Sequence, residues 1–166
     1  MDKDSQNLNQ ENKHISGIVH VLLSQDYALF FLSVVLGVVF DILFKVHFFN
    51  SAIYEYIGLG LIFFGSIIIY WSQFTTRTMG KRVAENRDVN FFLQGPYKYT
   101  RNPTNFGLTL AILGLGLLIH SLFSVIFVIV VYFVSKIFFI KKQDAILKER
   151  YGSVFEDYIK KVKDWL

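Results

Sequence analysis

Hydrophobic stretches divide the chain into four segments, each close to the length that crosses a membrane. The first two run from Tyr27 to Phe49 and from Ala52 to Phe74, with a short uncharged turn between them. The third, Asn105–Ile119, is shorter, and only a break at His120 separates it from Ser121–Ile140. Since about 20 apolar residues in a helix cross the hydrocarbon core, the pattern predicts an all-α, polytopic membrane protein. It has about four transmembrane helices, arranged as two helical hairpins.

The polar positions divide the chain further. Residues 1–26 form a polar N-terminal segment that ends in a short apolar lead-in, too short to span a bilayer. We expect residues 27–74 to form the first transmembrane hairpin. Residues 75–166 then contain a loop, the second hairpin and a C-terminal helical tail. In that tail Tyr151, Phe155, Tyr158 and Val162 recur at helical spacing, which predicts an amphipathic helix that folds over the loop. A helix lying on the bilayer surface is the alternative.

Composition and charge support the membrane assignment. Of 166 residues, 53% are hydrophobic and 18% charged, which is too apolar for a soluble domain of this size. Lysines and arginines gather in the loop and the tail, whereas the two opposite turns carry none; the loop contributes Arg77, Lys81, Arg82, Arg87, Lys98 and Arg101. Because positive loops stay on the cytoplasmic side, we expect the loop and both termini to be cytoplasmic. The net charge of +4 therefore indicates topology, and we expect no nucleic-acid partner.

Several polar and small residues inside the spans have structural interpretations. The chain has no cysteine, and its four histidines lie far apart, so no metal site is predicted. Asp41 and Lys45 lie four residues apart, which favours a local pair that lowers the cost of burial over a transport role. Six glycines in the second and third helices are expected to allow close helix packing: Gly58, Gly60, Gly65, Gly107, Gly114 and Gly116.

The most informative segment runs from Gly95 to Gly107 and contains both prolines of the chain, Pro96 and Pro103. Proline fixes φ and suits the first turn of a helix, so the pattern predicts a shaped turn that leads into a helix. A helix start offers free amides to an anionic group, and Arg101 adds a cation beside it. Tyr97 and Tyr99 are equally typical of an aromatic belt at the membrane surface.

This segment resembles the signature of membrane methyltransferases that include isoprenylcysteine carboxyl methyltransferase and the phospholipid N-methyltransferases. In that signature Gly-Pro-Tyr and then Arg-His/Asn-Pro precede a helical hairpin, and an acidic pair, a leucine and Phe/Tyr-Gly follow it. The corresponding residues after the hairpin are Gln143, Asp144, Leu147, Tyr151 and Gly152. The resemblance covers roughly Thr75 to Leu166. It implies transfer of a methyl group from S-adenosylmethionine to the carboxylate, amine or hydroxyl of a lipid-like acceptor in a membrane, here a bacterial inner membrane.

The resemblance also implies a site. Arg101 and Asp144 are expected to act as a catalytic pair across one pocket, because the hairpin can bring them together. The other expected residues bind the cofactor: Gly95, Tyr97, Asn102, Pro103, Thr104, Asn105 and Gln143. The alternative is that Arg101 binds lipid phosphate while Asp144 neutralises Lys141 or Lys148.

The chain departs from the family pattern at three positions. Asn105 stands where a tyrosine is usual, and Gln143 lacks one carboxylate of the acidic pair. Phe139 stands where the prenylcysteine enzymes have an arginine that meets the substrate carboxylate, so a prenylcysteine substrate is not expected. Two further hypotheses remain open, a related NADPH-dependent reductase of sterol-like substrates and a non-catalytic membrane protein on the same scaffold.

Overall fold

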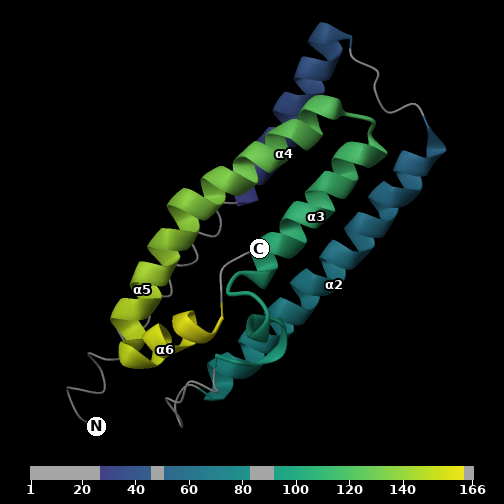
Figure 1. Ribbon diagram of the computed structural model, residues 1–166. Helices are drawn as coiled ribbons and strands as arrows, with labels where there is room; N and C mark the ends of the chain where they lie inside the picture. Colours follow the sequence, from purple (N-terminus) through teal and green to yellow (C-terminus); the bar gives the residue numbers. More distant parts are fainter. Residues whose placement is uncertain (1–26, 46–50, 83–91, 163–166) are drawn as a thin grey trace, which may run out of the picture.

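The computed structural model describes residues 27–45, 51–82 and 92–162 (Figure 1). These ranges contain helices and turns and no strand, which confirms the all-α prediction for the part described. The elements, in chain order, are the helix Tyr27–Phe44, α2 (Ala52–Arg82), the 3₁₀ turn η2 (Gly95–Lys98), α3 (Pro103–Leu118), α4 (Leu122–Ser135), the π-helical turn η3 (Lys136–Ile140), α5 (Lys141–Tyr151) and α6 (Ser153–Lys161). The polar N-terminal segment lies outside the described residues.

Three helices are long and apolar enough to cross a membrane, judged by length and composition. They are Tyr27–Phe44, Ala52–Thr78 and Leu122–Glu149, with mean hydropathies of 2.4, 1.9 and 2.6. The third predicted span corresponds to α3, which is apolar but has 16 residues. At 1.5 Å per residue α3 is about 24 Å long, several ångströms short of a hydrocarbon core of about 30 Å. The protein is thus a polytopic membrane protein by these criteria, and the count of four spans stays a prediction.

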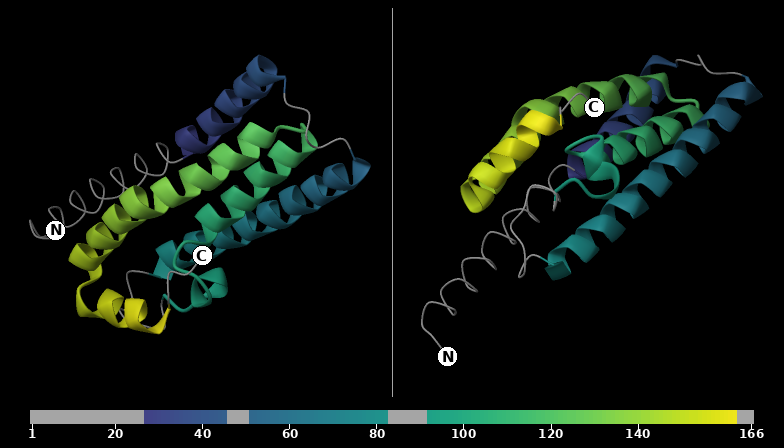
Figure 2. Two further views of the ribbon diagram at one scale, coloured as in Figure 1. Left: turned by 45° about the horizontal axis from the view of Figure 1, so that its top comes forward. Right: turned by 60° about the horizontal axis from the view of Figure 1, so that its bottom comes forward.

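The helices lie side by side in an order that differs from the order in the chain. Figures 1 and 2 show α3 between α2 and α4, with the helix Tyr27–Phe44 on the far side of α4. α3 and α4 lie next to each other, as the second predicted hairpin requires, and their membrane topology stays a prediction. The two members of the predicted first hairpin do not pack along each other; each packs against one side of the second hairpin.

Glycines bring α2 and α3 into close contact. A Cβ atom on Gly65 would lie 2.5 Å from the carbonyl oxygen of Gly107, and one on Gly114 would lie 2.5 Å from that of Gly58. The reverse contacts would be 2.8 Å for Gly107 and 2.6 Å for Gly58, so these four glycines form two matched crossing points between antiparallel helices. Gly116 packs against Val125. The packing role predicted for these five glycines is confirmed, whereas Gly60 faces open space and the prediction was wrong there.

Gly60 supplies a control for this packing. Gly65→Ala should destabilise the α2–α3 pair by about 1–2 kcal/mol, because the added methyl group meets backbone that cannot move aside. Gly60→Ala should be neutral or slightly stabilising, since alanine favours a helix. Thermal unfolding of both variants in the same detergent measures the difference. Equal melting temperatures for the two variants would contradict the close packing.

Polar contacts attach the helix Tyr27–Phe44 to α4. Asp41 accepts a hydrogen bond from the Ser121 hydroxyl and another, at 3.4 Å, from the backbone N–H of Phe123. The Ser124 hydroxyl donates to the carbonyl oxygen of Val34 at 3.1 Å. Asp41 thus lies at the N-terminus of α4, where the helix dipole stabilises a negative charge. The sequence pointed only to Lys45 as its partner because the α4 contact spans 80 residues of chain.

The tail forms the small core at the other end of the bundle. Phe155, Tyr158 and Val162 of the α6 segment are almost fully buried. They pack against Phe92, Leu93, Leu147, Tyr151 and Ile159. The prediction that the tail folds over the loop is confirmed, because Phe92 and Leu93 precede the shaped turn. The tail thereby covers the loop that leads into α3.

Candidate active site

The loop before α3 is held in a fixed shape by its prolines and glycine. Pro96 is buried in the turn η2, and Pro103 is the buried first residue of α3. Gly95 has φ +55°, a left-handed conformation that favours glycine, and a Cβ atom there would collide with the Thr75 side chain. The shaped turn and helix start predicted from the two prolines are both present.

A hydroxyl network fixes this loop to α2. The Tyr97 hydroxyl lies 3.0 Å from the Ser72 hydroxyl and 2.8 Å from that of Thr76, and Ser72 lies 2.6 Å from the Thr104 hydroxyl. Three of the predicted cofactor-binding residues, Gly95, Tyr97 and Thr104, therefore contact α2. Ser72 and Thr76 were not among the predicted site residues, although two hydroxyls one helical turn apart in an apolar helix are a visible signal in the sequence.

The tail is bonded to the same loop. The Tyr158 hydroxyl donates to the carbonyl oxygen of Tyr97 at 2.8 Å. Burial raises the pKa of Tyr158 well above its ordinary value, and Tyr97 acts in the same direction. Tyr158 therefore stays protonated and available as a donor over the physiological pH range.

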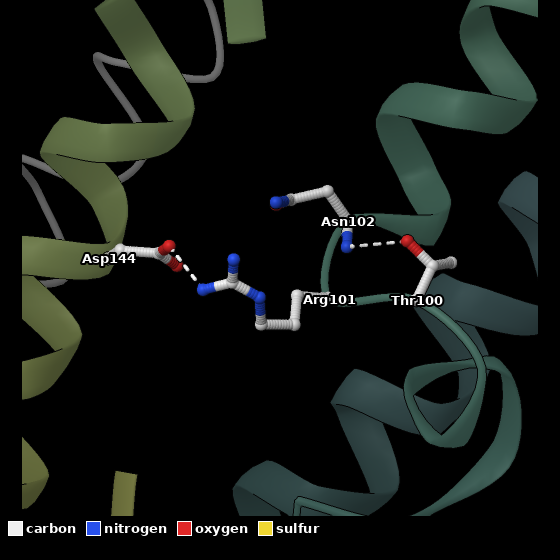
Figure 3. A network of polar contacts seen from close by, with 4 residues as sticks. All are labelled: Thr100, Arg101, Asn102 and Asp144. Carbon is white, nitrogen blue, oxygen red and sulfur yellow. Dashed lines mark hydrogen bonds and ion pairs between the residues drawn. The ribbon is translucent and has the colours of Figure 1, made fainter. Parts of the chain in front are cut away.

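Arg101 and Asp144 meet across the space between the loop and α5. Nη1 of Arg101 lies 2.5 Å from Oδ2 of Asp144, with the two side chains 14% and 23% exposed. Arg101 comes from the loop immediately before α3, and Asp144 lies in the first turn of α5 (Figure 3). The sequence predicted that the hairpin brings these residues together, and the structure contains the contact. A charge-assisted pair with this little exposure is held more firmly than an ion pair at the surface.

Two asparagines lie next to this ion pair along the chain. Asn102 extends its side chain from the loop toward α5, on the same side as Arg101 (Figure 3). Its Nδ2 atom is buried and has no hydrogen-bond partner among the described residues, and the same holds for Oδ1 of Asn105. Nδ2 of Asn105 donates to the Ser135 hydroxyl at 2.9 Å. Because buried polar atoms are nearly always bonded, a buried donor on Asn102 and a buried acceptor on Asn105 that lack partners among the described residues point to a polar ligand.

The predicted site residues thus divide into two groups. Arg101, Asn102 and Asp144 gather on the α5 side of the loop, and Gln143 is half-buried next to Asp144 in α5. The other predicted residues shape and hold the loop, and Asn105 links α3 to α4. Together they define a polytopic membrane protein with a polar, charged site at the end of the bundle that carries the tail.

Comparison with known proteins gives the family. The family model for phospholipid methyltransferase matches residues 53–154, well over half of the chain. The chain belongs to the phospholipid methyltransferase family, and it is therefore a membrane methyltransferase of the kind that acts on lipid-related substrates. The match includes α2 and leaves out the helix Tyr27–Phe44. No curated protein and no solved structure matches the chain.

Proposed function

We propose that the protein transfers a methyl group from S-adenosylmethionine to a lipophilic acceptor, with the donor bound beside Arg101 and Asp144. The observation that carries the proposal is their 2.5 Å contact, which joins the loop to α5. The amino-acid part of S-adenosylmethionine also presents a positive and a negative group side by side. Family membership supports the reaction type.

The residues present fit this donor. The guanidinium of Arg101 matches a carboxylate in shape and charge, and Asp144 matches an ammonium group. The free Nδ2 of Asn102 and the free Oδ1 of Asn105 offer one donor and one acceptor more. A bound ligand that satisfies both atoms removes the free-energy cost of leaving them buried and unbonded.

The chain's own groups act mainly by alignment and exclusion of water. S-adenosylmethionine would supply an activated methyl group: a nucleophilic oxygen or nitrogen of the acceptor would bond to the methyl carbon in one step, while the carbon–sulfur bond breaks and S-adenosylhomocysteine leaves. Such a reaction needs two reactants held in line and little covalent help from the protein. Arg101 and Asp144 fix the donor, and the buried cluster around Phe155 keeps water from the loop. The acceptor, a carboxylate, amine or hydroxyl on a lipid-like molecule, reaches the site from the surrounding bilayer.

Methyl transfer is testable in membranes from cells that express the chain. With S-adenosylmethionine labelled in its methyl group, we expect label in the organic-solvent extract, above the level of membranes without the protein. Supplying lipids with a free amine, carboxylate or hydroxyl in separate reactions then identifies the acceptor class. Label that stays at background for all three classes, with folded protein present, would contradict the proposed reaction.

The proposed orientation places the site on the cytoplasmic side, with the basic loop and tail. Single cysteines at Ser51 and Ser153 test it, since both residues are exposed and the chain has no cysteine of its own. Ser51 should react with an impermeant thiol reagent added to intact cells, whereas Ser153 should react only after lysis. The reverse pattern would overturn the orientation. Ser121, at the other outer turn, is unsuitable because it is buried and caps α4.

A further inference from the structure

A π-helical turn separates the end of α4 from the helix that carries Asp144. This turn, η3, covers Lys136–Ile140 between Ser135 and α5. π turns are rare, and they contain one residue more per turn than an α-helix. Ser135 is fully buried and bonded to Asn105 in the first turn of α3. Asp144, nine residues later, contacts Arg101, which immediately precedes the same end of α3. Both side chains must therefore face α3.

An uninterrupted α-helix from Ser135 to Asp144 would not point both side chains toward α3. Each residue turns an α-helix by about 100°, so nine residues would place Asp144 about 180° from Ser135, on the opposite face. If the π turn takes up one residue, the offset falls to about 80°, within reach of the long Arg101 side chain.

The burial pattern also changes across η3. Ser124, Val128 and Ser135 are the fully buried positions of α4. Continued at α-helical spacing, this stripe would reach Lys142, which is exposed. The half-buried positions of α5 begin one residue later and are Gln143, Asp144, Ile146, Leu147 and Tyr151; Leu147 and Tyr151 pack on the tail core.

We propose that η3 sets the register of α5, and that Ser135, held by Asn105, is the positioning residue from which that register is counted. The π turn takes up one residue so that Asp144 faces Arg101 and Leu147 faces the tail. The claim that this register matters for catalysis rests on the function proposed above. The claim that η3 sets the register is independent of that function.

A deletion and an insertion at one position test the register. Ile137 lies inside η3 and its side chain is exposed, so Ile137→Ala controls for loss of the side chain. Removing Ile137 should convert η3 to α-helix and leave Asp144 on the same face. Inserting one alanine after Ile137 should turn Asp144 away by about 100°. If η3 did not set the register, both the deletion and the insertion would turn Asp144 away, and both variants would lose the contact between Arg101 and Asp144.

Cross-linking measures the register of α5 in the absence of any ligand. Cysteines replacing Arg101 and Asp144, treated with a short bifunctional thiol reagent, should cross-link in the parent chain and in the deletion variant, but not in the insertion variant. Cysteines replacing Asn105 and Ser135, upstream of the change, should cross-link in all three. A deletion variant that loses either cross-link, or an insertion variant that keeps the first, overturns the proposal.

A second experiment tests whether the register matters for function. It measures binding of S-adenosylmethionine in chains that keep Arg101 and Asp144. We expect the deletion variant to bind as the parent does and the insertion variant to bind roughly tenfold or more weakly, as for loss of a charged hydrogen bond. Equal binding by both variants would show that the register does not matter for the donor. A parent chain that binds no S-adenosylmethionine while the cross-links behave as expected would refute the proposed function and leave the register proposal standing.

Discussion

Replacing Arg101 or Asp144 with alanine should weaken S-adenosylmethionine binding or raise the methyl-transfer barrier by on the order of 1.5–3 kcal/mol, the range for a hydrogen bond to a charged group. Each change also leaves its partner's charge only partly exposed and without its closest ion-pair contact, since the two side chains are 14% and 23% exposed. Arg101→Lys should restore little, because a point charge does not reproduce the planar fork of donors. Calorimetric titration and single-turnover methyl transfer measure the two effects.

The control is an exposed ion pair, formed by a lysine and an aspartate, outside the site. Lys160 and Asp157 contact each other at 3.0 Å on the exposed side of α6, and Asp157→Ala should change binding by less than about 0.5 kcal/mol. Wild-type affinity and transfer in both site variants, with folding intact, would remove Arg101 and Asp144 from the mechanism. The alternative role of Asp144, neutralising Lys148, is not favoured, because Lys148 lies 2.7 Å from Glu156.

Removing the tail should abolish donor binding. A chain truncated before Gly152 loses Phe155 and Tyr158, both 2% exposed, and uncovers Phe92 and Leu93 in front of the site. Phe155→Ala is the milder form of the same test. Large-to-small changes in a core cost about 3–5 kcal/mol for phenylalanine, which is enough to detach so small a cluster. Titration of both variants in detergent measures the loss.

Two tail variants separate the buried core from the tail's charged surface. Tyr158→Phe keeps the ring and removes only the hydrogen bond to the Tyr97 carbonyl oxygen, so it should cost about 1 kcal/mol. Lys160→Ala, on the exposed face, should leave binding unchanged. If the truncated chain folds and binds with unchanged affinity, the tail has only the membrane-surface role.

Features that follow from local spacing were predictable from the sequence. The helices follow from the apolar segments, and the buried face of α6 follows from the spacing of Phe155, Tyr158 and Val162. The Arg101–Asp144 contact was predictable because a hairpin returns the chain to the level at which it started. The resemblance carried by the residues around Pro96 and Pro103 led to the family that the comparison shows.

Features that depend on contacts distant in sequence were not predictable. The packing of the helix Tyr27–Phe44 on α4 includes the contact of Asp41 with the start of α4, which leaves no local pattern in the sequence. The contact of the Tyr97 hydroxyl with α2 was also not predictable, because it arises only when folding brings Ser72 and Thr76 level with the loop. Asn105 was interpreted as a departure from a family tyrosine, whereas its amide joins α3 to Ser135. The π turn is equally hidden, since its residues are ordinary for a membrane helix.

The most direct test of the central claim is calorimetric titration of the purified chain in detergent with S-adenosylmethionine and, separately, with NADPH. We predict saturable binding of S-adenosylmethionine, lost in Arg101→Ala and Asp144→Ala and kept in Asp157→Ala, with no binding of NADPH. Binding of NADPH alone would identify a reductase on the same scaffold. Binding of neither, by a folded chain, would indicate a non-catalytic protein, and either result would contradict the methyltransferase function proposed for this site.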